Sequence, residues 1–402
     1  MHLPCYFGIL RYATLVVFAG GWIQASASAI YRPASDAEIV ERIPQALLDL
    51  RARAPSRTID TPAISDPEHA IAAAMDAITL GRRDANPRLF GYAQAALAPW
   101  WSMPLPPLEI QLLRAFIHQA GHRFEAALRD LDGVLARDPR NAQAWLSRAA
   151  ILSVQGDYPT AIRACVHLAG RHRLIAATCT ARALLLTRHA PRVFAELQRT
   201  LNETASNQPE VQAWAQTTLA ELADLQGEPR IAARAFRTAL ALTPADTRRL
   251  AKYADHLLAN AENREVIRLL SGHRDALPLR LRLAIAKRRH DKRLPRADIR
   301  ALKEAFQTEQ RRGDPLHLRE AAVANLYLFD RPDSALTLAL ANWRVQRETA
   351  DARIVLAAAR AARRPEAARP VHTWLKKRGA SLPESGAPRP PARHPDDTHA
   401  LR

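Results

Sequence analysis

The stretch Ala142–Ile162, which reads AQAWLSRAAILSVQGDYPTAI, decides how this chain folds. The same order of small and large residues returns 34 positions earlier, from Leu108, and 34 positions later, from Ala176. Further copies, in phase with one another, begin at Ala213, Thr247, Leu316 and Ala350. Self-similarity at this period is typical of a solenoid, in which each repeat is a pair of helices that packs on its neighbours.

Each repeat also carries a turn between its two helices. The turns recur at His122-Arg123-Phe124, Gly156-Asp157-Tyr158, Gly227-Glu228-Pro229, Arg331-Pro332-Asp333 and Arg364-Pro365-Glu366. Small residues follow them at matching offsets, at Ala127, Ala161, Ala195, Ala232 and Ala335. A small side chain is needed where two helices cross closely, so we expect these alanines to lie between packed helices.

These residues resemble the tetratricopeptide repeat. Ala142–Val166 matches it best, because its Trp, small residue, Gly-Asp-Tyr and Ala-Ile stand in the family order. Ala213–Ala245 matches well, and Leu108–Asn141, Leu316–Thr349 and Ala350–Arg378 match in part. The resemblance implies an all-α fold, a right-handed superhelical solenoid of antiparallel helix pairs. It also implies a concave groove, lined by the first helix of each pair, that binds peptides or protein segments.

Residues 272–312 depart from the repeat. Hydrophobic residues alternate there at Leu277, Leu279, Leu281, Leu283 and Ile285, which is the period of a strand. A lone strand in a helical stack would have no partner for its backbone groups. We therefore predict a helix here too.

The chain divides into four expected segments. They are a signal peptide at 1–29, an N-terminal helical region of atypical pairs at 30–107, the repeat array at 108–379 and a disordered, Pro-rich tail at 380–402. Terminal repeats are often atypical because they cap the stack. A capping box at Ser35 and Glu38 predicts a helix at 36–52, and Ser65-Asp66-Pro67-Glu68 predicts the start of the next.

The N-terminus predicts export. Arg11 precedes an apolar run from Tyr12 to Ile23, and Ala27-Ser28-Ala29 offers small residues for cleavage. The run is shorter than the roughly 20 residues that span a bilayer, so we interpret it as a cleaved signal peptide. The mature protein is expected to begin at Ile30 and to be soluble in the periplasm.

The chain is strongly basic, with a formal net charge of +18 in 402 residues. Residues 264–304 hold 13 Lys or Arg against 5 Asp or Glu. These charges either solvate the helices or, if they converge on one side, attract an acidic partner or an anionic membrane surface. We do not predict a nucleic-acid partner.

No catalytic motif has the required spacing. The sequence lacks an H-E-x-x-H helix, a G-x-S-x-G elbow and a G-x-x-x-x-G-K-[ST] phosphate loop. His118 and His122 are four residues apart but have no third ligand nearby, and like His167 and His172 they are interpreted as surface histidines. We predict no catalytic, cofactor-binding or metal residues, hence no enzyme and no cofactor.

Two cysteines remain once Cys5 is removed with the leader. Cys165 and Cys179 fall on consecutive helices that should run antiparallel, which would bring their thiols level. In an oxidising compartment such a pair is a candidate disulfide. Two reduced core cysteines are the alternative.

The family resemblance maps one set of residues onto the groove. They are Glu109, Phe116, Gln119, Gln143, Ser147, Trp214, Glu221, Asp255 and Tyr327. These side chains either contact a bound peptide or are merely exposed helix residues. The hypothesis is a non-enzymatic periplasmic scaffold that binds a protein or peptide in its groove. The alternative is an envelope-associated protein whose basic surface binds anionic lipid or polysaccharide.

Overall fold

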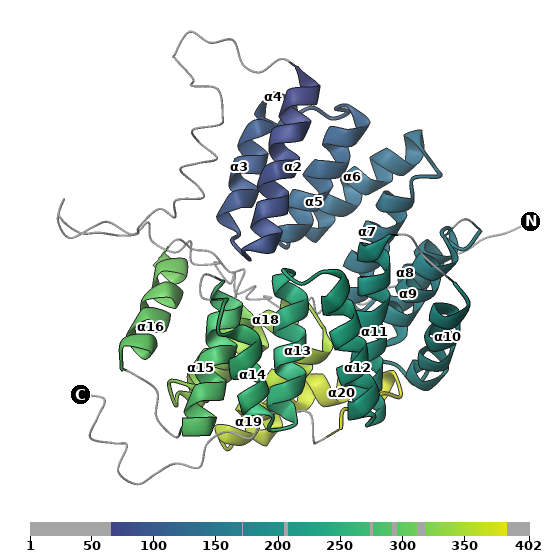
Figure 1. Ribbon diagram of the computed structural model, residues 1–402. Coiled ribbons are helices and arrows are strands. Elements are labelled where there is room, and N and C mark those ends of the chain that lie inside the picture. The colour runs from purple at the N-terminus through teal and green to yellow at the C-terminus, as the bar shows by residue number, and fades with distance from the viewer. Residues whose placement is uncertain are drawn as a thin grey trace, which may run out of the picture.

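The computed structural model describes residues 66–170, 172–204, 208–273, 276–291, 296–311 and 318–383. The predicted signal peptide, the helix expected at 36–52 and the tail from 384 lie outside these residues. All regular structure within them is helical (Figure 1). No helix in the described ranges is both long and apolar enough to cross a membrane.

The helices follow one another along the chain with short connections. The N-terminal ones are α2 (Pro67–Arg83), α3 (Arg88–Ala96), α4 (Ala98–Trp101), α5 (Leu108–Ala120), α6 (Phe124–Arg137), α7 (Ala142–Gln155), α8 (Tyr158–Val166), α9 (Arg173–Leu184) and α10 (Ala190–Glu203). The later ones are α11 (Pro209–Gln226), α12 (Pro229–Leu242), α13 (Thr247–Ala259), α14 (Asn263–Leu270), α15 (Leu277–Asp291), α16 (Arg296–Arg311), α17 (Leu318–Tyr327), α18 (Pro332–Val345), α19 (Thr349–Ala361), the 3-10 helix η2 (Pro365–Ala368) and α20 (Arg369–Lys377).

The helices pack as antiparallel pairs in sequence order, from α5 with α6 to α17 with α18, and each pair packs on the next. The predicted all-α solenoid of helix pairs is confirmed. The strand-like stretch is helix α15, as expected. Most of its alternating leucines and of the residues between them are buried, because α13, α14, α16 and α17 all pack against it.

Turn chemistry explains where the pairs bend. Gly156 and Gly227 end α7 and α11 in the left-handed region, with φ of 85° and 75°. Glycine adopts this conformation without the penalty that a Cβ brings. Other turns place His122, Ala261 and Asp330 at positive φ instead. The sequence therefore keeps the backbone shape of the turn even where it does not keep the glycine.

Four of the five predicted crossing alanines are fully buried, at Ala127, Ala161, Ala232 and Ala335. Ala195 is exposed, so its prediction was wrong. The other four lie three residues after the start of their helix, and in α10 that position is the buried Val193. α10 begins at Ala190, two residues before the position that the 34-residue period gives, and the period alone does not reveal this shift.

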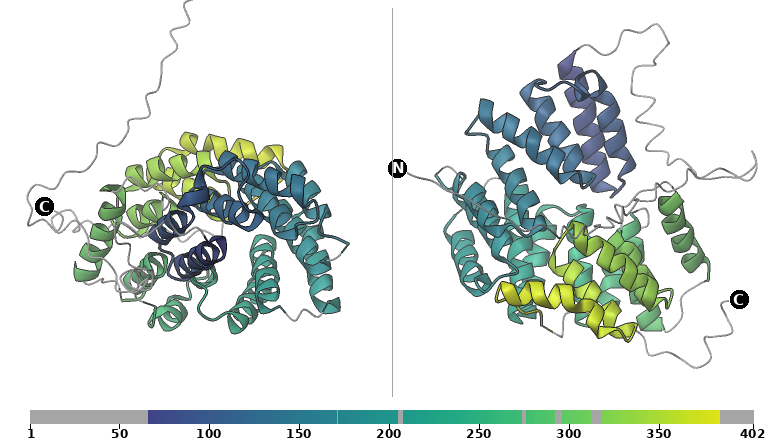
Figure 2. Two further views of the ribbon diagram at one scale, coloured as in Figure 1. Left: turned by 90° about the horizontal axis from the view of Figure 1, so that it is seen from above. Right: turned by 180° about the vertical axis from the view of Figure 1, so that it is seen from behind.

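The array closes on itself. The connection before α19 returns to the end of α7, where the amide of Arg347 donates to the carbonyl of Val154 at 2.8 Å. After α20, the carbonyl of Arg378 accepts from the amide of Arg188 at 3.0 Å. Figure 2 shows the result, with α20 (yellow) beside the blue and teal helices. The turn of helix pairs from α7 to α20 is therefore closed by contacts between its two ends, and we call it the ring.

Two arginines satisfy the carbonyls that α7 leaves without partners at its end. The guanidinium of Arg347 donates to the carbonyl of Gln155 at 2.6 Å, and that of Arg378 to the carbonyl of Gly156 at 3.0 Å. Cations at this end also complement the negative pole of the helix dipole. We call this contact between α7–α10 and the C-terminal unit the closing seam.

Aromatic packing completes the closing seam. Trp374 meets Tyr158 and Trp343 edge to face, with ring centroids 5.9 and 5.2 Å apart. The guanidinium of Arg378 lies 4.1 Å from the Trp374 ring centroid, a cation–π contact. Trp343 and Trp374 are both buried. The seam thus joins residues about 200 positions apart by apolar as well as polar contacts.

The N-terminal pair returns over the ring. The Thr247 hydroxyl, at the start of α13, donates to the carbonyl of Arg83, the last residue of α2. Seen from above, α2 and α3 lie over the centre of the ring (Figure 2, left). The cap predicted for the N-terminal region therefore covers the ring's upper side.

Candidate functional site on the inner face of the ring

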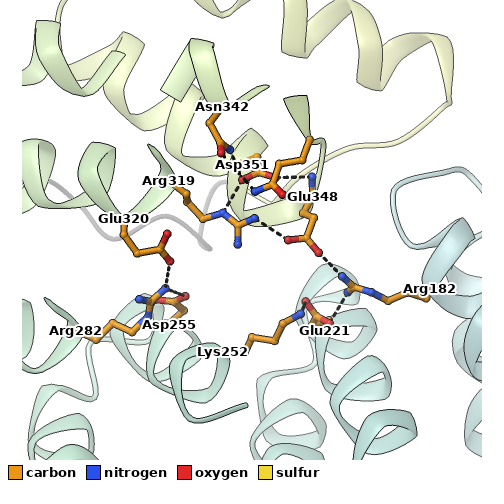
Figure 3. A network of polar contacts seen from close by, with 11 residues as sticks. Arg182, Glu221, Lys252, Asp255, Arg282, Arg319, Glu320, Asn342, Glu348 and Asp351 are labelled. Carbon is orange, nitrogen blue, oxygen red and sulfur yellow. Dashed lines mark hydrogen bonds and ion pairs between the residues drawn. The ribbon is translucent and has the colours of Figure 1, made fainter. Parts of the chain in front are cut away.

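Charged side chains from successive first helices meet inside the ring (Figure 3). We call this set the inner network; its members are Arg182, Glu221, Lys252, Asp255, Arg282, Arg319, Glu320, Asn342, Glu348 and Asp351. Apart from Asn342 and Glu348, they lie on the first helices α9, α11, α13, α15, α17 and α19. At least one residue from each successive unit thus reaches the same interior.

One half of the inner network is centred on Glu221. Arg182 donates to its carboxylate at 2.7 Å and Lys252 at 2.5 Å. Burial alone would raise the pKa of Glu221, but Arg182 and Lys252 outweigh it and hold the pKa below its usual value. The carboxylate therefore stays charged and ties α9 to α11 and α13.

Glu348 links this half to the C-terminal unit. Its carboxylate accepts from Arg182 and, at 2.7 Å, from Arg319. Burial opposes the charge, yet Arg319, Arg182 and Lys252 hold the pKa of Glu348 well below its usual value. Because Arg182 and Glu348 are 166 residues apart, this ion pair also closes the ring from within.

Asp351 has no exposed surface and lies deepest in the network. Arg319 donates to it at 2.6 Å, and the Asn342 amide donates to the same oxygen at 2.6 Å. Burial raises the pKa of Asp351 despite Arg319, and the nearby Glu348 raises it further. Asp351 therefore takes up a proton more readily than an ordinary aspartate does as the pH falls.

The other half joins α13 to α15 and α17. Arg282 donates to both oxygens of Asp255, at 2.8 and 2.7 Å, and lies 3.8 Å from Glu320. Its guanidinium also donates to the carbonyls of Ala251 and Pro278. Such a fork-shaped pair fixes both side chains. The inner face is thus a rigid arrangement of charges rather than a set of loose side chains.

The structure places the predicted groove residues in different surroundings. Glu221 and Asp255 belong to the inner network. Glu109 and Gln143 are exposed, and Gln119 and Ser147 are partly exposed, with Gln143 donating to the Ser147 hydroxyl at 3.1 Å. Of the predicted groove residues, only Glu221 and Asp255 join the inner network.

Three aromatic groove candidates pack against the protein itself. Tyr327 is buried, and the Arg289 guanidinium lies 5.3 Å from its ring centroid, so Tyr327 belongs to the core and its assignment to the groove was wrong. Trp214 is partly buried against the cluster that holds Cys165 and Cys179. Phe116 is partly buried and meets Phe90 edge to face at 6.0 Å.

Sequence reasoning missed most of the inner network. Arg182, Arg282 and Arg319 stand on first helices, as do the predicted acids Glu221 and Asp255. Charged residues repeated on the inner side of successive first helices were a signal that could have found them. Glu348 gave no such signal, because it lies in a connection and reaches the network only through the closure of the ring.

The sulfurs of Cys165 and Cys179 are bonded in the structure, with Cα atoms 5.6 Å apart. Both side chains are buried among Ala149, Ala164 and Leu168. The bond joins α8 to α9, as the antiparallel placement of the two helices predicts.

The basic stretch 264–304 does not form one open surface. Arg282 is buried, and Arg288 donates to the carbonyls of Tyr327 and Leu328, at the end of α17, and to Asp330 at 2.6 Å. Arg289 donates to the carbonyl of Leu258 in α13 at 3.2 Å. Part of the positive charge is therefore used to satisfy helix C-termini.

Within the described ranges, no histidine is a member of the inner network. Burial lowers the pKa of His118, whose ring accepts from Arg123 at 2.9 Å, and His167 stacks on Trp145 at 3.8 Å. His256 is buried and pairs with Asp224 at 2.7 Å. In the part of the chain that the structure describes, no three His, Cys, Asp or Glu side chains gather as metal ligands would.

No protein-family model matches the chain, and no curated protein matches it. Among solved structures it is similar to the crystal structure of the P58(IPK) TPR domain, with 17% sequence identity and a TM-score of 0.24. The alignment covers 74% of this chain and 98% of that one. We transfer no residue role at this level of similarity.

Proposed function

We propose that the protein is a non-enzymatic periplasmic scaffold that binds a protein or peptide segment on the inner face of its helix-pair array. The inner network supports this most directly. It holds charged groups from six units in fixed positions, and fixed side chains lose little entropy when a partner binds. Arrays of helix pairs offer extended surfaces of this kind for protein partners.

Photo-cross-linking tests this proposal in cells. A photoreactive amino acid would replace Gln143 or Ser147 on the first helix α7, and, as the matched control, exposed Thr238 on the second helix α12. Cross-links to one partner from the α7 positions, and not from Thr238, are expected. Equal cross-linking from both helices, or none from α7, would contradict binding on the inner face.

The proposed location has its own test. Sequencing of the mature N-terminus should begin at or near Ile30, because the leader is expected to be cleaved after Ala29. Intact Met1 in a cytosolic fraction would contradict export without bearing on the inner face.

A second candidate function is attachment to an anionic envelope surface. Residues 360–378 carry seven Lys or Arg and one acid, Glu366. Six of these cations are exposed on the last unit of the array, at Arg360, Arg363, Arg364, Arg369, Lys376 and Lys377. Each Lys or Arg near an anionic leaflet contributes about 1 kcal/mol of attraction. The cluster therefore suits anionic lipid better than the stretch 264–304 does.

Vesicle sedimentation separates the two candidates. Attachment to phosphatidylglycerol vesicles should be strong at low salt and collapse as salt rises, because exposed charges are screened over about 10 Å at 0.1 M salt. Vesicles of phosphatidylcholine are the control. Equal sedimentation with both lipids would argue against this second candidate.

A further inference from the structure

Two arginines face the place where the N-terminal pair meets the ring. Arg82 precedes the last residue of α2, and Arg248 is the second residue of α13. Their sequence neighbours are hydrogen-bonded, since the Thr247 hydroxyl donates to the Arg83 carbonyl. This bond brings two cations from distant parts of the chain to the contact between α2 and α13, where each residue keeps some exposed surface.

The two guanidinium groups repel one another. Loss of hydration lowers the pKa of Arg248, and Arg82 and Arg182 lower it further, while Glu348 and Asp246 act in the opposite direction. Within the described residues, neither Arg82 nor Arg248 forms an ion pair with an acid. The fold thus brings like charges toward one another without an acidic partner for either, while the Arg82 guanidinium lies over the Phe116 ring.

The nearby acids are already engaged elsewhere. Glu348 accepts from Arg182 and Arg319, and Glu221 from Arg182 and Lys252. Asp246 accepts from Arg249 at 2.9 Å and caps the start of α13. The positive charge of Arg82 and Arg248 is therefore left over after the network's own pairs are formed.

Hydration by water is a sufficient reason for the other exposed arginines to be present, but it does not account for the placement of Arg82 and Arg248. Arg230, Arg234 and Arg237 lie along α12, and each extends into water from the same helix. Arg82 and Arg248 are the sequence neighbours of Arg83 and Thr247, which are 164 residues apart, and only a specific tertiary contact brings these two helices together. The two positive charges raise the electrostatic potential around this contact. An anionic group bound there would lower that potential.

We propose that Arg82 and Arg248 receive acidic side chains of the partner, so that the segment bound on the inner face is an acidic peptide. This inference rests on the proposed scaffold function and specifies the chemistry of its partner. Phe116, partly buried with its ring centroid 6.0 Å from the Arg82 guanidinium, offers an apolar contact beside the carboxylates.

Fluorescence anisotropy with a defined probe tests the proposal on the full mature chain. The probe is a labelled peptide of alternating Glu and Ala, and a peptide of alternating Gln and Ala is its uncharged control. The double variant Arg82→Gln, Arg248→Gln should bind the acidic peptide about tenfold more weakly at low salt, and the difference should shrink as salt rises.

The matched control is Arg230→Gln, Arg234→Gln, which removes the same charge from the exposed face of α12. It should change the affinity less than about twofold, because long-range attraction alone contributes little at separate sites. Equal weakening by both double variants would reduce the effect to net charge and overturn the proposal. Failure of the unaltered chain to bind the acidic peptide would overturn it too.

Melting temperature supplies a second readout. Removing a like-charge pair should leave the melting temperature unchanged or raise it, so a fall larger than that of the α12 variant would show that the arginines serve the fold instead. Cross-linking from α7 separates this inference from the scaffold function. If the double variant Arg82→Gln, Arg248→Gln still cross-links its partner unchanged, the scaffold function is supported and the acidic-partner inference is contradicted.

Discussion

At the scale of single residues, two glycines show what the closing seam requires beyond a turn. Gly156 and Gly227 hold the same position after α7 and α11 and have similar positive φ. A Cβ on Gly227 would meet open space, whereas one on Gly156 would lie 3.3 Å from Trp374 Nε1 and 3.4 Å from an Arg378 nitrogen. The two sites therefore separate backbone strain from crowding at the seam.

Replacing each glycine by alanine should destabilise both variants, and Gly156→Ala the more. Strain in the left-handed region costs about 1–2 kcal/mol and is common to both. Gly156→Ala adds the displacement of Trp374 and Arg378, so its melting temperature should fall further than that of Gly227→Ala. The melting temperatures are measured by circular dichroism. An equal fall for both variants would mean that Trp374 and Arg378 move aside without loss of stability.

The disulfide is the second prediction at this scale. Thiol titration of the denatured, unreduced mature protein should find no free thiol, because Cys165 and Cys179 are bonded. Reduction should lower stability by up to about 3 kcal/mol, the chain-entropy value for a loop of about 15 residues. Two free thiols per chain would show that the cysteines are reduced core residues in the cell.

At the scale of helices, arginines act as caps. Arg288 and Arg289 occupy the carbonyl ends of α17 and α13, and Arg347 and Arg378 occupy that of α7. The last carbonyls of a helix have no partner within it, and a cation there is favourable. Much of the basic character that suggested a docking surface is, in these helices, part of the fold.

This role predicts that reversing the charge of Arg288 harms stability. Arg288→Glu should lower the melting temperature by removing three hydrogen bonds and placing a carboxylate beside the end of α17. Arg268→Glu is the control, because Arg268 is exposed on α14 and pairs only with its neighbour Glu265 among the described residues. Equal melting temperatures for the two variants would contradict the capping role.

At the scale of the whole molecule, the inner network makes the ring sensitive to acid. Burial disfavours the charged forms of Glu221 and Glu348, but their cationic neighbours hold both pKa values below the ordinary value of 4.5. The stability that they contribute is therefore present above pH 4.5 and is lost as the pH falls below it. Asp351 opposes this loss, because its raised pKa lets it take up a proton earlier.

Glu348→Gln should separate this effect from general acid unfolding. The variant should melt lower than the unaltered chain near neutral pH, because Arg182 and Arg319 lose a shared carboxylate. Its melting temperature should then change less between neutral pH and about pH 4. Glu125→Gln, at an exposed acid on α6, is the control. An acid response identical to that of the unaltered chain would exclude Glu348 as its source.

The limits of prediction follow the same scales. Helix pairs, their turns and the helical character of α15 could be predicted, because each depends on neighbours within one repeat. The inner positions of Glu221 and Asp255 could also be predicted from the repeat. The burial of Tyr327 and the role of Glu348 could not, because both depend on contacts between units far apart in the chain.

The closing seam changes how the array should come apart. A linear stack of repeats loses its end units first, since each terminal repeat has one neighbour instead of two. In this molecule the unit that begins with α7 and the unit that ends with α20 are each other's neighbours, through Arg347, Arg378 and Trp374. Fraying from the C-terminus is thus suppressed, and the units from α7 to α20 should melt as one cooperative block.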